Sequence, residues 1–392
     1  MIRFKLLVLL LTICFFSPAI ISAQMVWTCA TDSAEWTIRS MHTSVVFDNK
    51  MWVMGGSNVT SDVWYSADGM NWTCATNSAG WLGRCGHTSV VFNDKIWVLG
   101  GVPFRNDVWY SINGANWTQV TAAAGWSPRW KHTSVVFDNK IWVLGGEEYS
   151  YRPSNDVWYS ADGINWTCAT DSAGWSPREF HTSIVFDNKI WVLGGDEYPY
   201  RARNDIWYSA DGINWICATD SAGWSPRYGH TSLVFDNKIW VLGAGNDVWY
   251  SADGANWTCA TVTAEWSPRR GHTSLVFNNK MWVIGGNPDP CADLNDVWYS
   301  TGLGVEENHS LLSANRILLE VYPNPAKSYF TVRLPQTADR SEIKMFDVTG
   351  KIVKSEELKG KNNRIPLDGI KNGVYFVKIN NNNQVTKLIV TK

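Results

Sequence analysis

The sequence predicts an all-β protein in which a six-bladed β-propeller is followed by a small antiparallel β-sandwich. Six near-copies of one unit, each with four short runs of β-favouring residues, fill residues 27–300. A repeat of roughly 40 to 50 residues with four strands is typical of propeller blades. The histidine that begins each copy is found at His42, His87, His132, His181, His230 and His272.

The tryptophans predict how the ring closes. One recurring tryptophan belongs to the fourth strand of each unit, in the motif "NWT" or "NWI", and five copies of it follow His42. Trp27, in "VWTCAT" near the N-terminus, supplies the sixth copy. We therefore predict that this N-terminal strand completes the last blade, which removes an exposed sheet edge.

Strand and turn patterns recur inside every unit. In "KIWVLGG", Ile and Val share one face and Trp and Leu the other, while "SADG" supplies Asp and Gly where a hairpin needs positive φ. A double glycine ends the second strand in five units, and the fifth unit has Gly243 and Gly245 around Ala244. With the aromatic and the tryptophan downstream, this pattern resembles kelch repeats. The resemblance implies a kelch-type propeller over residues 24–300.

The N-terminus has the pattern of a secretory signal peptide. Arg3 and Lys5 precede an apolar stretch, and small residues follow it, so residues 1–23 are predicted to be removed during export. We expect no transmembrane segment in the mature chain, because no other apolar run approaches about 20 residues. Residues 301–315 lose the repeat and are predicted to be a linker.

Residues 316–392 form a separate basic domain. They carry 14 Lys plus Arg against 7 Asp plus Glu, whereas residues 24–315 carry a net charge of −11. The acidic propeller argues against a nucleic-acid partner, because such binding depends on neutralising phosphates. The tail reads as short strands separated by turns, which predicts the β-sandwich.

The tail resembles the C-terminal sorting domain of the type IX secretion system of Bacteroidetes. The resemblance is carried by "YPNPA" (322–326), "DVTGK" (347–351), "NGVYFVKI" (372–379) and "TKLIVTK" (386–392). It implies that residues 316–392 engage the type IX secretion machinery and that the protein is secreted or held at the outer cell surface. Family members usually lose this tail and are then released or attached to lipopolysaccharide.

Cysteine spacing indicates neither a disulfide framework nor a redox motif. Five cysteines occupy one repeat position on the fourth strands, and we interpret them as small buried hydrophobic residues. Cys85 and Cys291 lie outside that register, in loops of blades two and six, and a bridge between them stays open. The chain has no Cys-x-x-Cys pair.

Each unit contains an Arg-x-x-His motif, followed by an Asp where the third strand begins. A histidine ring could hold a metal or relay protons. We instead interpret the set as structural, because it recurs in every blade and an Arg–Asp pair would satisfy both charges. We predict no catalytic residue, metal or cofactor. Blades three and four provide the structural set Arg129, His132, Asp156, Arg178, His181 and Asp205.

Binding residues are predicted where the copies differ. The pair before each histidine and the loop after each double glycine vary, and strand counting places both zones on one face. Aromatic rings with arginine and carboxylate groups are typical of glycan and protein sites. The candidate ligand-binding residues are Phe104, Arg105, Trp130, Tyr149, Tyr151, Arg152, Glu179, Tyr198, Tyr200, Arg201, Arg203, Tyr228 and Arg270.

The sequence favours a monomeric, non-enzymatic binding or adhesion module over an enzyme. "YSADGxNW" is similar to the Asp-box of sialidases but is one residue short, and that box is structural there. Kelch propellers include a sialic-acid mutarotase, so a mutarotase-like or glycosidase-like enzyme is the alternative, with Glu179 and Glu148 near Arg178 as acid-base candidates. Stiffening of long loops by Tyr and Arg, with neutral drift among the repeats, would also explain the variable positions.

Overall fold

The computed structural model describes residues 25–149, 151–288, 292–302, 320–322, 326–333, 341–347, 351–358, 362–379 and 385–391. The chain divides into two compact units, Met1–Val305 and Glu306–Lys392. The predicted signal peptide, residues 1–23, lies outside the described residues, as does most of the predicted linker. Among the described residues, no helix is long and apolar enough to cross a lipid bilayer.

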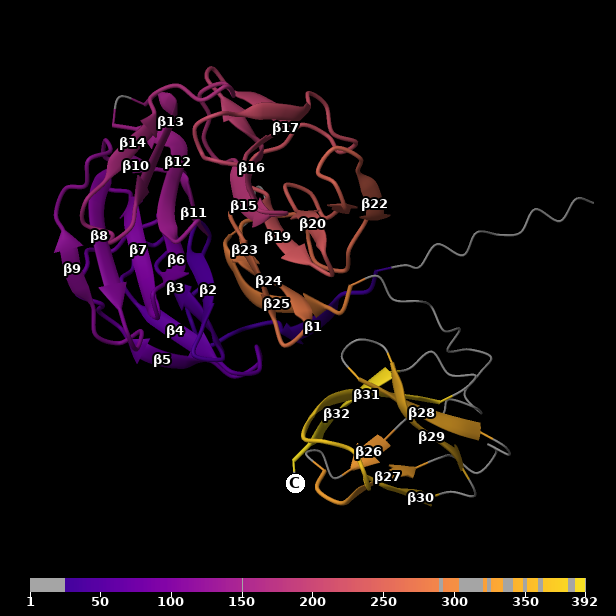
Figure 1. Cartoon of the computed structure of the whole chain (residues 1–392). Helices are drawn as coiled ribbons and strands as arrows, with labels where there is room; N and C mark the ends of the chain where they lie inside the picture. The colour runs from indigo at the N-terminus through magenta and orange to yellow at the C-terminus, as the bar shows by residue number, and fades with distance from the viewer. Residues whose placement is uncertain are drawn as a thin grey trace, which may run out of the picture. The chain divides into compact units, whose positions relative to one another are not determined.

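The first unit is a ring of six antiparallel four-stranded blades, which follow one another in chain order (Figure 1). Blades one to three contain β2 (Thr43–Phe47), β3 (Lys50–Met54), β4 (Val63–Ser66) and β5 (Thr73–Thr76); β6 (Thr88–Phe92), β7 (Lys95–Gly101), β8 (Arg105–Ser111) and β9 (Thr118–Thr121); β11 (Thr133–Phe137), β12 (Lys140–Glu148), β13 (Pro153–Ser160) and β14 (Thr167–Thr170). Blades four to six contain β15 (Thr182–Phe186), β16 (Lys189–Glu197), β17 (Arg201–Ser209) and β18 (Ile216–Thr219); β19 (Thr231–Phe235), β20 (Lys238–Leu242), β21 (Val248–Ser251) and β22 (Thr258–Thr261); β23 (Thr273–Phe277), β24 (Lys280–Gly286), β25 (Leu294–Ser300) and β1 (Thr28–Thr31). The six-bladed propeller predicted from the repeats is confirmed.

The two ends of the propeller sequence meet in the sixth blade. The N-terminal strand β1 pairs antiparallel with β25, with Thr28 opposite Tyr299 and Cys29 opposite Trp298. The predicted closure of the ring by the N-terminal strand is therefore confirmed. A short extra strand, β10 (Arg129–Trp130), pairs with both β8 and β12 and so joins blades two and three into one sheet.

Apolar side chains fill the spaces between neighbouring blades. The second strand of each blade is buried on both faces, because it packs against the blade before and the blade after it. In β7, Ile96, Val98 and Leu99 have no exposed surface. The Trp97 indole N–H donates to the Phe92 carbonyl at 2.9 Å, so this ring is buried without losing its hydrogen bond.

The double glycine is required by contact with the next blade. Gly100 has φ +60°, which disfavours any side chain. A Cβ there would lie 2.9 Å from Cε1 of His132 and 3.1 Å from the carbonyl oxygen of Arg129. The close approach leaves room only for a residue without a Cβ.

A buried arginine ties each blade together. The Arg178 side chain has no exposed surface, and Asp205 lies 2.8 Å from its guanidinium. The same group donates to the Gly194 carbonyl at 2.9 Å and lies 5.8 Å from the Trp175 ring. The other five blades repeat this pair as Arg39–Asp62, Arg84–Asp107, Arg129–Asp156, Arg227–Asp247 and Arg269–Asp296.

The interpretation of the repeated cysteines as buried is wrong. Cys29, Cys74, Cys168 and Cys217 are exposed. They lie on the outermost strands, which have a neighbouring strand on one side only, so their side chains face solvent. Cys85 is buried with a free thiol, while Cys291 lies outside the described residues.

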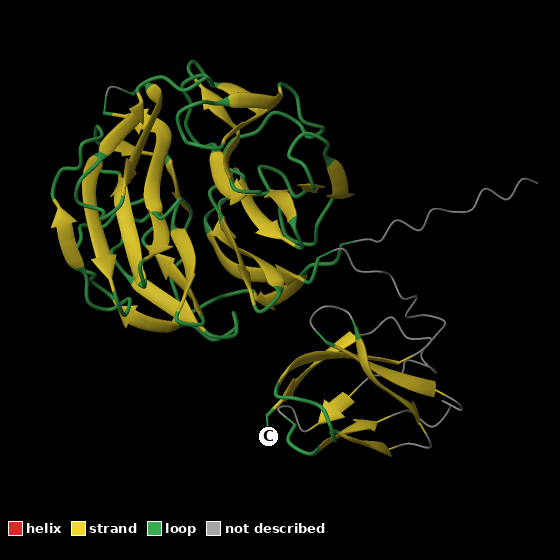
Figure 2. Ribbon diagram, in the orientation of Figure 1, coloured by secondary structure: helices red, strands yellow, loops and turns green. Residues whose placement is uncertain are grey.

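The second unit is a β-sandwich of two antiparallel sheets (Figure 2), as predicted. One sheet contains β26 (Glu320–Tyr322), β27 (Tyr329–Arg333) and β30 (Asn362–Pro366); the other contains β29 (Ile352–Leu358), β28 (Ser341–Phe346), β31 (Gly373–Ile379) and β32 (Val385–Val390). Phe330 and Val332 of the first sheet and Met345, Val377 and Leu388 of the second belong to one buried core.

We predict that Arg178→Met destabilises the propeller by roughly 3 to 5 kcal/mol, because the buried Asp205 carboxylate loses its two guanidinium hydrogen bonds. Among the described residues, this carboxylate keeps only Arg203, at 3.9 Å, and the Trp207 indole N–H. Chemical denaturation of the purified protein measures this change. The control is Lys189→Met in the same blade, whose ammonium is partly exposed and pairs with Asp187 at 2.7 Å; its effect should stay under about 1 kcal/mol. Equal effects of the two substitutions would contradict the prediction.

Candidate functional site

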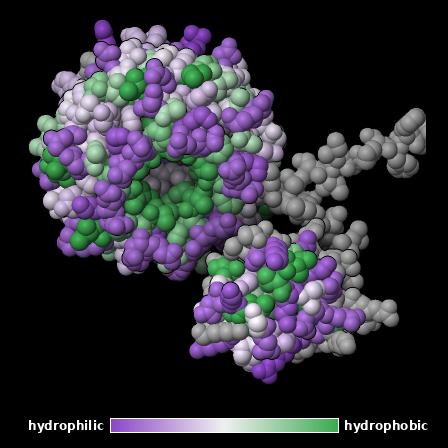
Figure 3. Space-filling view, in the orientation of Figure 1, coloured by the Kyte–Doolittle hydropathy of each residue, from purple (hydrophilic) through white to green (hydrophobic). Residues whose placement is uncertain are grey.

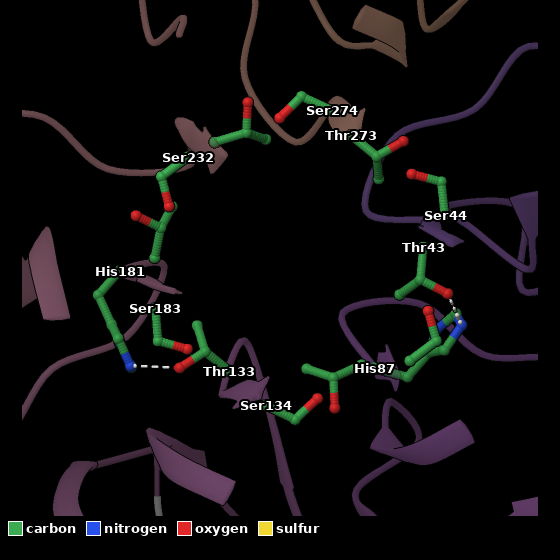
Figure 4. A pocket seen from close by; sticks show the side chains of 14 residues that line it. Thr43, Ser44, His87, Thr133, Ser134, His181, Ser183, Ser232, Thr273 and Ser274 are labelled. Atoms are coloured by element: carbon green, nitrogen blue, oxygen red, sulfur yellow. Dashed lines mark hydrogen bonds between the residues drawn. The ribbon is translucent and has the colours of Figure 1, made fainter. Parts of the chain in front are cut away.

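The axis of the propeller is a channel lined by the first strands of the blades. The space-filling view shows the ring hollowed at its centre (Figure 3). A cavity of about 200 Å³ is surrounded mainly by threonine and serine side chains from β2, β6, β11, β15, β19 and β23 (Figure 4). Hydroxyl and threonine methyl groups together form this wall, and none of its side chains is a carboxylate, an ammonium or a guanidinium.

Histidines link the blades around this channel. The Thr133 hydroxyl lies 3.0 Å from Nε2 of His181 in the next blade, and four further Thr–His pairs repeat this contact. Burial and the nearby Arg129 lower the pKa of His132 to about 3. The other five histidines also have lowered pKa values, again through burial first. The histidines are therefore neutral inter-blade contacts at neutral pH.

A ring of backbone hydrogen bonds surrounds one mouth of the channel. The residue before each histidine donates its N–H to the same residue of a neighbouring blade, at 2.7 to 3.1 Å, around all six blades. All six of these residues have positive φ, and in three blades the residue is glycine. Met41, Lys131 and Phe180 adopt the conformation despite their side chains, and they line a cavity of about 220 Å³. Strained residues of this kind cluster at functional sites.

Lys131 forms the centre of a buried polar cluster at this mouth. Its ammonium lies 2.8 Å from Glu147 and 3.1 Å from Glu179. The same ammonium sits 3.9 Å from the Trp130 ring centroid and 4.5 Å from that of Phe180. Two carboxyl groups and two aromatic rings thus surround one cation.

The two carboxyl groups of this cluster share a proton. Burial and the hydrogen bond with Glu147 raise the pKa of Glu179 to about 8. Burial opposes ionisation of Glu147 as well, but its hydrogen bonds with Glu179 and Lys131 outweigh that effect and lower its pKa. At neutral pH the cluster consists of one carboxylate, one carboxylic acid and one ammonium, and its charges balance.

Aromatic side chains continue outward from the mouth. The Phe180 and Tyr228 ring centroids are 5.9 Å apart. The Arg270 guanidinium lies over the Tyr228 ring at 4.5 Å and donates to its hydroxyl at 3.1 Å. The predicted candidates Glu179, Tyr228 and Arg270 are therefore placed around one opening.

A second group of predicted residues meets on blades two and three. The ring of Phe104 is in edge-to-face contact with Trp130 at 6.2 Å, Tyr149 at 5.3 Å and Tyr151 at 5.6 Å between centroids. Tyr149 and Tyr151 are 73% and 68% exposed. The rings of Tyr149 and Tyr151 are therefore accessible to solvent, unlike the buried and half-buried tryptophans of the blades.

Blade four presents a third group. Tyr198 and Tyr200 lie at the connection from β16 to β17 and are 71% and 87% exposed. Arg203 pairs with Glu197 at 2.9 Å, and Arg201 is exposed. We name the β12–β13 and β16–β17 connections, which carry these tyrosines, the tyrosine hairpins.

The predicted acid-base pair is not brought together. Glu148 accepts from the Arg129 guanidinium at 3.3 Å, while Glu179 contacts Glu147 and Lys131. Arg178 is held by Asp205. Arg105 lies on β8, where it is opposite Arg129 of β10 and next to Phe104.

The predicted candidates do not include Lys131, Glu147, Phe180 and Asp196, although Lys131 and Phe180 belong to the variable pair before the histidines. Asp196 is buried, which raises its pKa, and its backbone pairs with that of Glu179. A usable signal was present at two of the four positions. Lys131 and Phe180 occupy a position that is glycine in three blades. The positive φ at this position favours glycine, so the presence of a side chain there is the signal.

Comparisons with known proteins agree with this architecture. Residues 86–286 match the KLHDC2/KLHL20/DRC7 Kelch-repeats domain, and residues 320–392 match the Secretion system C-terminal sorting domain. The solved structure of YjhT superimposes with a TM-score of 0.58 at 14% identity, over 68% of this chain and 96% of that chain. At this identity the likeness concerns the fold.

One curated relative shares part of the sequence. Beta-agarase A of Zobellia galactanivorans is 36% identical over 107 residues, which are 24% of this chain and 20% of the agarase. The chain thus spans a fifth of that relative's length. The sorting-domain match confirms the predicted export, and the protein reaches the cell surface or the extracellular space by type IX secretion.

We predict that the stability advantage of the wild type over Glu179→Gln decreases as pH rises from about 5 to 8. The buried histidines, whose pKa values are lowered, make the unfolding free energy of both proteins rise with pH up to about 6.5, so the Glu179 contribution is the difference between the two slopes. A carboxyl group whose pKa is raised in the folded state stabilises the fold at low pH, and this contribution is lost as pH rises through about 8. The change in slope is at most about 1.4 kcal/mol per pH unit. The Gln amide keeps a donor for Glu147.

The measurement is urea denaturation between pH 5 and 9. Glu148→Gln serves as the matched control, because that side chain is one-third exposed and pairs with a different cation at 3.3 Å. If Glu179→Gln and the wild type keep the same slope, the shared proton is excluded.

Proposed function

This chain belongs to the KLHDC2/KLHL20/DRC7 Kelch-repeats family, and we propose that its propeller is a non-enzymatic binding and adhesion module for an extracellular glycan or protein. The ligand is proposed to lie across the face that carries the channel mouth and the tyrosine hairpins. Export places this face where a glycan or another cell's proteins are accessible.

The exposed tyrosines carry this proposal. Tyr149, Tyr151, Tyr198 and Tyr200 are each at least 68% exposed, whereas the tryptophans of the blade frame are buried or half-buried. Large rings in solvent contribute little to the stability of the propeller. Tyrosine is, however, among the residues that contribute most to binding, because it buries a large rigid surface at a low entropy cost.

The arrangement around these tyrosines supports the same proposal. Phe104 holds Tyr149 and Tyr151 in edge-to-face contacts, so their rings are partly ordered before a ligand arrives. Such preorganisation lowers the entropy cost of binding. The charged side chains nearby would fix the orientation of a polar ligand.

We predict that the pair of substitutions Tyr149→Ala and Tyr151→Ala weakens ligand binding by about tenfold or more, as expected for central aromatic residues of an interface. The exported protein and its variants are screened on arrays of glycans and of extracellular proteins, and the Kd of each hit is measured. Ile213→Ala and Ile216→Ala, at exposed positions next to the outer strand of blade four and on it, form the control and should leave Kd unchanged. Binding that tolerates these two substitutions together with Tyr198→Ala and Tyr200→Ala would place the site elsewhere.

A carbohydrate-active enzyme is the second candidate, favoured by one observation. A pKa of about 8 keeps Glu179 protonated at neutral pH, which is the state a general acid requires, and Glu147 beside it is ionised. Mutarotation and hydrolysis of sugars would be followed by NMR. We expect Glu179→Gln to abolish any such turnover and Glu148→Gln to retain it. No turnover by the wild type over a broad sugar panel rejects this candidate.

A further inference from the structure

The two tyrosine hairpins are copies of one recognition element. Both contain the sequence Tyr-x-Tyr-Arg, at residues 149–152 and 198–201. The N–H of Tyr151 donates to the Glu148 carbonyl at 2.8 Å, and the N–H of Tyr200 donates to the Glu197 carbonyl at 2.7 Å. Adjacent blades therefore present Tyr, Tyr and Arg at the same spacing and share this backbone hydrogen bond.

Both turns hold a tyrosine in a conformation that its side chain disfavours. Tyr151 has φ 56° and Tyr200 has φ 74°, and positive φ is unusual for a bulky residue. Glycine would adopt this turn without strain. The rings are 68% and 87% exposed, so burial does not offset the strain. An exposed aromatic residue kept in a strained turn points to a function of the ring.

The accessible charges of the hairpins are positive. Arg152 and Arg201 are exposed, and neither has an ion pair with a carboxylate among the described residues. The carboxylates of the same hairpins are already engaged, because Glu148 pairs with Arg129 and Glu197 with Arg203. This local charge is opposite to the net −11 of residues 24–315.

We propose that the tandem tyrosine hairpins bind an anionic polysaccharide, each hairpin taking one part of the repeating chain. Tyrosine rings would stack on sugar faces, and the Arg152 and Arg201 guanidinium groups would hold carboxylate or sulfate groups with paired hydrogen bonds. This inference rests on the proposed binding function and specifies its ligand class.

Three features favour a polysaccharide over other anionic polymers. The repeated element matches a ligand with repeating units, and two linked contacts on one chain raise the overall affinity. The exposed rings provide flat apolar faces of the kind that sugar rings cover. A nucleic acid carries one charge per roughly 1.7 Å, and the acidic remainder of the propeller opposes such a charge density.

The test measures binding of the full-length exported protein to immobilised polygalacturonate, dextran sulfate and neutral dextran, with polyglutamate as an anionic polypeptide. We expect at least one anionic polysaccharide to bind about tenfold more tightly than dextran, with an affinity that falls between 50 and 200 mM NaCl. Polygalacturonate and dextran sulfate separate carboxylate from sulfate recognition.

Variants locate the contact. Arg152→Ala and Arg201→Ala should each weaken binding several-fold, and the double variant by about tenfold or more. Lys140→Ala and Lys189→Ala, which remove one positive charge each at the opposite end of the same two blades, should change affinity less than about twofold. Both arginines are exposed, so circular dichroism and thermal unfolding of their variants should match the wild type.

Other outcomes overturn the inference in distinguishable ways. If the tyrosine variants abolish binding of some ligand while the arginine variants have no effect, the proposed binding function stands and the anionic class is wrong. Equal, arginine-dependent binding of polyglutamate identifies an acidic polypeptide instead. If no polysaccharide binds although a protein ligand is found, the polysaccharide is excluded. Absence of any ligand in both screens rejects the proposed function together with this inference.

Discussion

Every blade of the propeller begins with an arginine whose charge is almost completely buried, and the rest of each repeat is organised around neutralising it. Arg84 donates to Asp107 and to the Gly100 carbonyl at 2.8 Å, beneath the Trp81 ring. Its own carbonyl accepts from the N–H of Gly56 in the preceding blade at 2.9 Å. Arg84 therefore forms hydrogen bonds within its own blade through its side chain and with the preceding blade through its carbonyl oxygen. An Asp, a double glycine and a tryptophan are needed together, which explains why all six copies retain the set almost unchanged.

The same constraint decides where the copies can differ. The two residues after each arginine and the connection between the second and third strands lie at one end of the blade, beyond the buried ion pair. Side chains there do not enter the inter-blade core. Lys131 and Phe180, Tyr149 and Tyr198 occupy such positions, whereas the neutral histidines and the hydroxyl-lined channel keep the sixfold pattern. The asymmetric chemistry of the molecule is therefore confined to one end of a symmetric frame.

Repeats predict this fold because each blade must bury the same faces against its neighbours, and Trp27 alone was enough to predict the ring closure. Features that depend on distances between blades were not predictable. The cluster of Lys131, Glu147 and Glu179 forms across a blade boundary, and nothing in local sequence brings its members together. Alternation likewise could not decide which face of an outer strand meets solvent, so Cys168 was assigned to the core although it is exposed.

The blades differ in how far their second and third strands extend at the face that carries the tyrosine hairpins. In blade five, β20 ends at Leu242, β21 begins at Val248, and residues 243–247 connect them. In blade four, β16 extends to Glu197 and β17 begins at Arg201. Strands that project beyond the frame hold their connecting turns farther from it, and only blades three and four carry the tyrosines on such turns. At the mouth the charges of the Lys131 cluster cancel, so its buried carboxyl groups add little field at the hairpins. Arg152 and Arg201 are therefore the exposed charges that accompany the tyrosine rings, although the propeller as a whole is acidic.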